Sequence, residues 1–262
     1  MFAQPSADSP HRSVTNAQEI HLVRRHQPSQ STSRQEPAGA EWPALLFDLD
    51  GTLIDSNYQH VAAWSEALRS ARIVIPQWKI HRRVGMSGKS FLKELLRELP
   101  RRKTNPDLDQ LEKGHDSIFR RSIPRLWALP GANQLLKHLA QHRVRIAIAT
   151  TGGQAQTSLL LKHLDLPRAI EIVTGDDVEK AKPAPDIFVA AAERLHVAID
   201  NCIVVGDSVW DMLAAGRKSA LGVALQSGGY GVEDLERAGA FRVYSDAADM
   251  LMHLEQLGLP GT

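Results

Sequence analysis

The sequence has 262 residues, enough for one large domain or a domain with an insertion, and it is long enough to bury a sizeable core. Its 43% hydrophobic and 23% charged residues exclude a chain that is disordered throughout, and also the collagen-like and coiled-coil classes. With 31 Lys and Arg against 30 Asp and Glu, the net charge of +1 gives no reason to expect nucleic acid or an anionic membrane as a partner.

The single cysteine, Cys202, excludes an intrachain disulfide framework and a zinc site with several cysteines. It comes directly before an apolar run, so we expect a small buried side chain there rather than a reactive thiol. No apolar run approaches the roughly 18 residues of a membrane-spanning helix, and the N-terminal stretch lacks the apolar segment of a signal peptide. We therefore expect a cytoplasmic protein without membrane contact.

Residues 1–40 are rich in Ser, Gln, Pro and Arg and carry one short apolar cluster. Such a segment buries too little apolar surface to offset the entropy lost on ordering it. We therefore predict a disordered N-terminal tail. A partner-binding arm and a misassigned start codon are alternatives that the sequence does not separate.

From residue 43 onward, short apolar runs alternate with amphipathic helical patterns. The runs have the length of buried strands, and several are rich in β-branched residues. They lie at residues 44–47, 144–149, 169–173, 203–205 and 221–225. Helical periodicity covers residues 131–142, 157–164, 185–195 and 211–215. Strands that alternate with helices predict an α/β fold whose parallel sheet is covered on both faces.

The stretch 57–127 departs from this alternation because it contains helical patterns only. They lie at residues 58–71, 90–99 and 108–121. An all-helical stretch inserted after the first strand predicts a separate helical cap over residues 57–127. The α/β core would then consist of residues 41–56 and 128–262.

Polar residues follow the ends of the predicted strands. They are Asp48 and Asp50 after the first strand, Thr150 and Thr151 after the second, Lys182 after the third, and Asp207 and Asp211 after the fourth. In a parallel sheet these strand ends meet at one edge, where ligands bind. A lone Asp-x-Asp would be weak support for a site, because surface turns are rich in aspartate.

Four ordered motifs resemble those of the haloacid dehalogenase superfamily of phosphohydrolases. They are Asp48-Leu-Asp-Gly-Thr-Leu-Ile-Asp-Ser56, a strand ending at Thr150, Lys182-Pro-Ala-Pro-Asp-Ile-Phe188 and Gly206-Asp-Ser-Val-Trp-Asp211. The resemblance covers residues 43–245, and the helical stretch stands where that superfamily has its helical C1 cap. It implies a Rossmann-like α/β core with an inserted α-helical cap.

The resemblance also implies a role for each catalytic residue. Asp48 would be the nucleophile that forms an aspartyl-phosphate, and Asp50 would act first as general acid and then as general base. Thr150 and the backbone near Thr151 would donate hydrogen bonds to the phosphoryl oxygens, and Lys182 would neutralise negative charge. The acid role of Asp50 predicts a pKa above that of a free carboxyl.

Mg²⁺ is the implied cofactor, because a carboxylate and a phosphate repel each other unless a cation lies between them. Its implied ligands are the side chain of Asp48, the backbone carbonyl of Asp50 and the side chain of Asp207. Asp211 completes the candidate metal set, although ordering Lys182 or a metal-bound water is its favoured role.

Two parts of the predicted cap are candidates for substrate contact. His60 resembles a residue at the start of the cap in β-phosphoglucomutase and related phosphatases, where it could couple cap closure to proton transfer; an ordinary surface histidine is equally compatible with the sequence. Gly88 and Lys89 lie in a stretch, residues 84–90, that looks like the cap loop approaching the active site in those relatives.

We predict a Mg²⁺-dependent phosphatase that acts on small phosphate monoesters such as sugar phosphates or phosphoglycolate-like compounds, as a monomer or homodimer. Asp50 supports this function, because dehalogenases release a halide that needs no proton and lack this second aspartate. A β-phosphoglucomutase-like phosphosugar mutase is the alternative, although Gly88 stands where the mutase has an arginine. A non-catalytic binding protein is disfavoured, because a binder has no need of a complete catalytic set.

Overall fold

The computed structural model describes residues 42–98, 106–168 and 170–262. The predicted N-terminal tail at residues 1–40 lies outside the described residues. So do the last residue of the helix predicted at 90–99 and the first residue of the strand predicted at 169–173.

The core is a single sheet of six parallel strands in the order β3-β2-β1-β4-β5-β6. The strands are β1 (Ala44–Phe47), β2 (Ile146–Ala149), β3 (Glu171–Val173), β4 (Cys202–Gly206), β5 (Leu221–Leu225) and β6 (Arg242–Tyr244). All but β6 coincide with a predicted apolar run. The pattern missed β6 because this three-residue edge strand begins with an exposed arginine. The sheet and its helices confirm the predicted Rossmann-like α/β fold.

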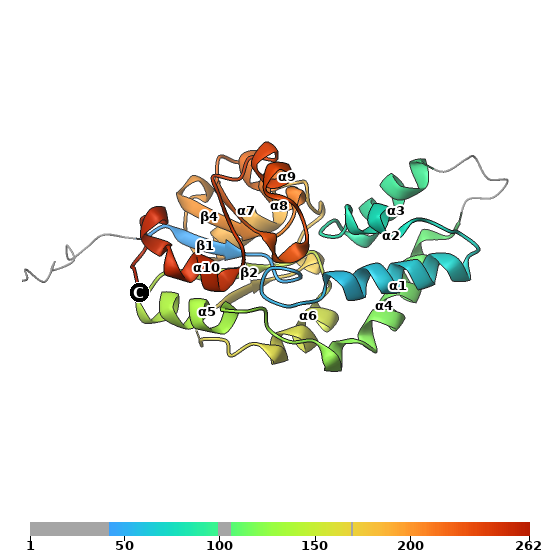
Figure 1. Ribbon diagram of the computed structural model, residues 1–262, viewed down its shortest axis with the longest axis horizontal. Helices are drawn as coiled ribbons and strands as arrows, with labels where there is room; N and C mark the ends of the chain where they lie inside the picture. The colour runs from blue at the N-terminus through green and yellow to red at the C-terminus, as the bar shows by residue number, and fades with distance from the viewer. Residues whose placement is uncertain (1–41, 99–105, 169) are drawn as a thin grey trace, which may run out of the picture. The chain divides into compact units, whose positions relative to one another are not determined.

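Helices cover both faces of the sheet (Figure 1). They are α5 (Ala132–Gln141), α6 (Gln154–Leu160), α7 (Asp186–Arg194), α8 (Val209–Gly216), α9 (Val232–Arg237) and α10 (Ala247–Met252). Alternate residues of a strand point to opposite faces, so Leu45 and Phe47 pack in one core with α5 and α10, whereas Leu46 packs in the other with α7 and α8. Cys202 is buried in this second core, as expected.

Among the described residues, five α-helices stand between β1 and β2 in the chain; α5 covers the sheet, and we call the first four the helical insert. They are α1 (Asn57–Ser70), α2 (Gln77–His81), α3 (Gly88–Arg97) and α4 (Leu108–Arg120). Val61, Trp64 and Leu68 recur at helical spacing along α1 and form a hydrophobic core with residues of α3 and α4. Figure 1 shows the insert beside the end of the sheet at which β1 leads into α1. The sequence patterns missed the short helix α2.

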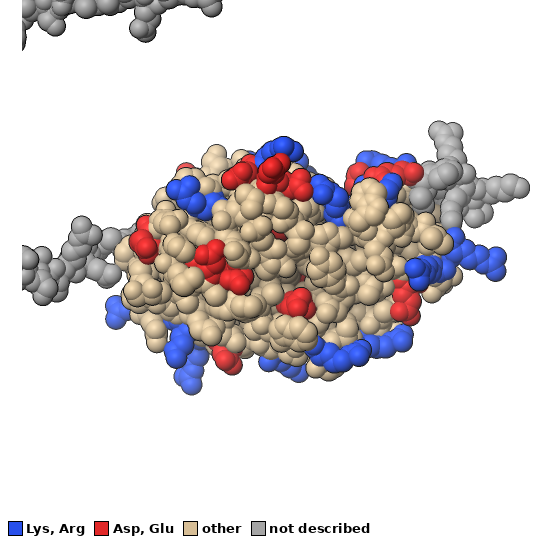
Figure 2. Space-filling view, viewed as in Figure 1, with Lys and Arg blue, Asp and Glu red and all other residues tan. Residues whose placement is uncertain are grey.

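The surface carries charges of both signs. On the face shown in Figure 2, basic and acidic side chains are interspersed, in keeping with the small net charge of the chain. Within the described part of the chain, no helix has the length and apolar character needed to cross a membrane.

Candidate active site

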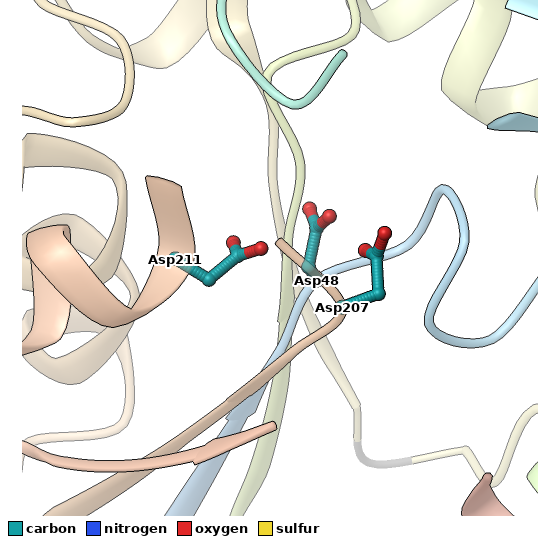
Figure 3. A group of neighbouring side chains, drawn as sticks. All are labelled: Asp48, Asp207 and Asp211. Carbon is teal, nitrogen blue, oxygen red and sulfur yellow. The ribbon is translucent and has the colours of Figure 1, made fainter. Parts of the chain in front are cut away.

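Three aspartates from different segments meet at the carboxyl edge of the sheet (Figure 3). Asp48 follows β1, Asp207 follows the neighbouring strand β4, and Asp211 lies in the first turn of α8. The backbone N–H of Asp48 donates to the carbonyl of Val205 at 2.8 Å, which ties the end of β1 to β4. One carboxylate oxygen from each aspartate lies within 4.8 Å of the others, and all three residues are buried. The sheet therefore brings together residues that are far apart in the sequence.

The ammonium of Lys182 joins two of these carboxylates. Its Nζ lies 2.5 Å from Oδ1 of Asp48 and 2.7 Å from Oδ1 of Asp211, and its side chain is fully buried. Burial by itself lowers the pKa of Lys182, but the carboxylates of Asp211 and Asp48 outweigh this effect and raise it. The second oxygen of Asp211 accepts hydrogen bonds from the backbone N–H and the hydroxyl of Ser208, which caps α8. Asp211 is therefore held between the start of α8 and Lys182.

Asp207 has two hydrogen-bond donors of its own. The hydroxyl of Thr52 donates to Oδ1 at 3.0 Å, and the side-chain amide of Asn57 donates to Oδ2 at 2.7 Å. Burial, followed by the neighbouring charge of Asp211, raises the pKa of Asp207 to about 7 despite these hydrogen bonds, which act in the opposite direction. The carboxyl is thus held in one orientation while its ionisation stays unfavourable without a compensating cation.

The cluster has the composition of a divalent-cation site. Burial raises the pKa of Asp48 well above its usual range; Lys182 lowers it, whereas Asp211 and Asp207 add to the increase. The three buried carboxylates face a single ammonium, which does not balance their negative charge. Their hard oxygen atoms are the donors that Mg²⁺ prefers. The residues that are present therefore fit such a cation.

Asp50 lies beside this cluster and has separate partners. Its Oδ1 accepts from the hydroxyl of Ser56 at 2.6 Å and lies 3.2 Å from Nε2 of His60, while its Oδ2 lies 3.5 Å from the hydroxyl of Thr150. Burial raises the pKa of Asp50, but the charge and hydrogen bond of His60, with the hydrogen bond from Ser56, outweigh it and lower the pKa overall. The pKa of Asp50 expected from the sequence was raised instead, because the sequence does not reveal that His60 and Ser56 contact this carboxyl.

A cavity of about 420 Å³ lies over these residues, between the sheet edge and the helical insert. Of the residues that the sequence analysis selected, its lining contains Asp48, Asp50, His60, Gly88 and Thr151. The structure does not bring Lys89 into this lining. Its ammonium lies 3.0 Å from Oδ1 of Asp109 on the surface, where the Lys89 side chain is 60% exposed.

The family model for haloacid dehalogenase-like hydrolases matches this sequence over residues 42–217, about two thirds of the chain. The matched region includes the buried aspartates and Lys182. The chain belongs to this hydrolase family. The resemblance carried by the four sequence motifs is thereby confirmed, as is the prediction of a hydrolase.

Several known proteins are similar to this hydrolase. Hexitol phosphatase A of Escherichia coli (strain K12) is 33% identical over 175 residues, which are 66% of this chain and 79% of that protein. The bifunctional riboflavin kinase/FMN phosphatase of Arabidopsis thaliana is 30% identical over 173 residues, or 65% of this chain; this chain covers only 45% of its length. A solved structure of a hydrolase from Pseudomonas syringae shows 47% identity and a TM-score of 0.78, covering 82% of this chain and 99% of that one.

Several residues that contact the site of this hydrolase were not among those predicted from the sequence. Thr52 and Asn57 donate hydrogen bonds to Asp207, and Ser56 donates one to Asp50; their position inside or directly after the first motif was the available signal. Gly228 follows the predicted strand β5, whose end lies at the same edge of the sheet, whereas His115 reaches the site from a distant segment that carries no motif.

Gly228 is expected to be essential for the position of Asp207. A Cβ atom at residue 228 would overlap the carboxylate of Asp207, whereas a Cβ at Gly231 in the same loop would meet no atom within 4 Å. We propose that Asp207 is a ligand of the divalent cation, and we therefore expect Gly228→Ala to weaken Mg²⁺ binding by about 10- to 100-fold, the usual cost of disturbing a residue that orients a metal ligand. Isothermal titration with Mg²⁺ measures the effect, with Gly231→Ala as matched control; equal affinities of the two variants would contradict it.

Proposed function

We propose that this hydrolase is a Mg²⁺-dependent phosphatase that cleaves small phosphate monoesters through an aspartyl-phosphate on Asp48. One observation carries the proposal: Asp48 is paired with Lys182 at the base of a cavity, and a second carboxyl, Asp50, has His60 and Ser56 as separate partners. Two carboxyl groups in different environments can take different roles, one as nucleophile and one as acid and base.

In the first step, a carboxylate oxygen of Asp48 forms a bond to phosphorus while the bond from phosphorus to the ester oxygen breaks. Asp50 gives a proton to the departing oxygen. Because His60 lowers the pKa of Asp50, this proton belongs to the hydrogen-bonded pair of Asp50 and His60 rather than to an isolated carboxylic acid. Lys182 and the hydroxyl of Thr150 stabilise the negative charge of the phosphoryl oxygens.

In the second step, water attacks phosphorus, Asp50 accepts a proton from that water, and phosphate leaves so that Asp48 is restored. When bound, Mg²⁺ supplies positive charge that offsets the repulsion between the nucleophilic carboxylate and the phosphate. The side chains of Asp48 and Asp207 and the backbone carbonyl of Asp50 would hold it. Asp211, whose oxygens are engaged by Lys182 and Ser208, serves to position Lys182.

We further propose that residues 57–127 act as a cap over a core of residues 41–56 and 128–262, and that the substrate is a small sugar phosphate or a phosphoglycolate-like compound. The hydroxyl of Thr151 lies 3.4 Å from the carbonyl oxygen of Gly85, which joins the core to the insert beside the cavity. A volume of about 420 Å³ suits a small metabolite, and the relative from Escherichia coli is a hexitol phosphatase by name.

Release of inorganic phosphate from a panel of hexitol phosphates, aldose phosphates, phosphoglycolate and p-nitrophenyl phosphate tests this function. We expect release with Mg²⁺ and none with EDTA. No release by the folded, Mg²⁺-binding protein would reject the phosphatase proposal. Isomerisation of a phosphosugar that requires a bisphosphate, with a long-lived aspartyl-phosphate, would identify a mutase instead.

The pKa of Asp207 predicts how Mg²⁺ stabilises the protein. Its folded-state pKa of about 7 exceeds the ordinary value, so in the window between about pH 4 and that pKa the folded protein binds more protons here than the unfolded chain. This carboxyl therefore contributes less stability to the metal-free protein as the pH rises through that window. Mg²⁺ requires the ionised carboxylate, so the increase in Tm on adding Mg²⁺ should be larger at about pH 8 than at about pH 5.

Differential scanning fluorimetry with Mg²⁺ or EDTA at the two pH values measures this difference. In Asp207→Asn the Mg²⁺-dependent increase in Tm should be strongly reduced at both pH values. An increase in the variant as large as in the wild type would show that Asp207 does not bind the cation.

A further inference from the structure

A row of hydrogen-bonded side chains runs from Asp50 through the helical insert. Nε2 of His60 lies 3.2 Å from Oδ1 of Asp50, and Nδ1 of His60 lies 3.0 Å from Nε2 of His115. Nδ1 of His115 lies in turn 3.0 Å from Oδ1 of Asp116, whose side chain is 53% exposed. The row therefore leads from the predicted acid and base to a half-exposed carboxylate within α4, which lines the cavity together with His115.

Both imidazole rings are held by aromatic neighbours. The ring centroids of His60 and Phe119 are 3.7 Å apart with planes 10° from parallel, and those of His115 and Trp64 are 4.1 Å apart with planes 15° from parallel. The side chain of His115 is 6% exposed. Because stacked and buried rings turn over only with difficulty, the nitrogen atoms keep the positions that the row requires.

The carboxylate at the end of the row determines which nitrogens carry hydrogen. Ionised Asp116 can only accept, so Nδ1 of His115 is the donor. Burial lowers the pKa of His115 to about 4, although Asp116 acts in the opposite direction, so the ring is neutral at pH 7 and its Nε2 is an acceptor. Nδ1 of His60 must then donate to His115, which leaves Nε2 of His60 directed at Asp50.

We propose that His115, anchored by Asp116, is a positioning residue that holds His60 with its Nδ1–H directed away from Asp50 and its Nε2 directed at it. The arrangement resembles the way in which a buried carboxylate fixes the tautomer of a catalytic histidine, except that here a second histidine does so. The inference deepens the proposed phosphatase function, and its catalytic consequence rests on that function. His60 and His115 hold the carboxyl of Asp50 in the orientation needed for proton transfer to the leaving oxygen.

The loss of activity expected when Asp50 is no longer held depends on the leaving group of the ester. An alkoxide needs a proton as it departs, whereas p-nitrophenolate leaves without one, so the loss of a correctly held Asp50 affects the two classes of ester differently. We expect His115→Phe to lower kcat/KM for an alkyl phosphate by about 10- to 100-fold and for p-nitrophenyl phosphate by less than about threefold. Phenylalanine keeps the stacked ring and removes the acceptor nitrogen. His115→Gln supplies an amide oxygen as acceptor and should recover most of the loss.

Asp116 provides a second variant, at a half-exposed side chain. Asp116→Ala removes the anchor from an exposed side chain and should change the ratio of alkyl to aryl kcat/KM in the same direction, by a smaller factor. Asp116→Asn keeps an acceptor oxygen and serves as its matched control. A purely structural role would lower the rates for both esters equally in His115→Phe and Asp116→Ala, and that result would overturn the proposal.

The ¹⁵N chemical shifts of the imidazole nitrogens test the tautomers without reference to activity. In the wild-type protein we expect hydrogen on Nδ1 of His115 and a bare Nε2, together with hydrogen on Nδ1 of His60. Hydrogen on Nε2 of His115 would overturn the proposal even in an active enzyme. If the wild type releases no phosphate from any ester, the proposed function fails, while the ring spectra still decide whether His115 holds His60.

Discussion

Asp48→Asn should abolish phosphate release, with kcat lowered by about 10⁴-fold or more, as for the loss of other catalytic nucleophiles. An amide cannot form the aspartyl-phosphate, and Lys182 would retain only Asp211 as an ionised partner. Single-turnover and steady-state release from the best substrate of the panel measure the loss.

Asp200→Asn is the control for this variant, because Asp200 is exposed and lies outside the cavity lining. Circular dichroism verifies the fold of both variants, and mass spectrometry excludes deamidation of the new asparagine to aspartate. Activity of Asp48→Asn within about tenfold of the wild type would place the nucleophile elsewhere.

Lys182→Met should cost about 3 to 5 kcal/mol of folding free energy, because it leaves partners of a buried ion pair without compensation. The ammonium is fully buried between the carboxylates of Asp48 and Asp211. The variant should also lose phosphatase activity by at least about 10³-fold, since it removes the ammonium that lies beside the carboxylate of Asp48. Urea unfolding in EDTA, followed by circular dichroism, measures the stability without a contribution from metal.

Lys180→Met is the matched control for this second variant. Lys180 lies two residues away on an exposed stretch of the same segment, so its substitution should change the free energy of unfolding by less than about 0.5 kcal/mol. Equal unfolding free energies for the two variants would show that the buried ion pairs of Lys182 add nothing to stability. In that case Lys182 would contribute to the reaction and not to folding stability.

Local sequence patterns were sufficient to predict most of the strands and helices. Buried strands such as β1 and β4 are short apolar runs bounded by polar residues, and α1 shows its packed face as a stripe of Val61, Trp64 and Leu68. The elements that escaped, α2, α9, α10 and β6, are six residues or shorter, so that they span too few residues to display a period. Tertiary packing, rather than local preference, stabilises elements of this length.

The sequence by itself determined the α/β class and the central residues of the candidate site. Asp48, Thr150 and Asp207 directly follow strands of one parallel sheet, and the ends of such strands meet at one edge, so their convergence follows from local order along the chain. Lys182 was found by its motif, and the structure places it between the carboxylates of Asp48 and Asp211.

Only the tertiary structure decided which groups surround these residues. Asn57 reaches Asp207 across 150 positions of the chain, and His115 reaches His60 across 55. Lys89, in contrast, lies on the surface with Asp109 although its neighbour Gly88 lines the cavity. The lowered pKa of Asp50 has the same origin, since the pKa of a buried group depends on the charges and donors that packing brings to it, and periodicity along a chain does not specify them.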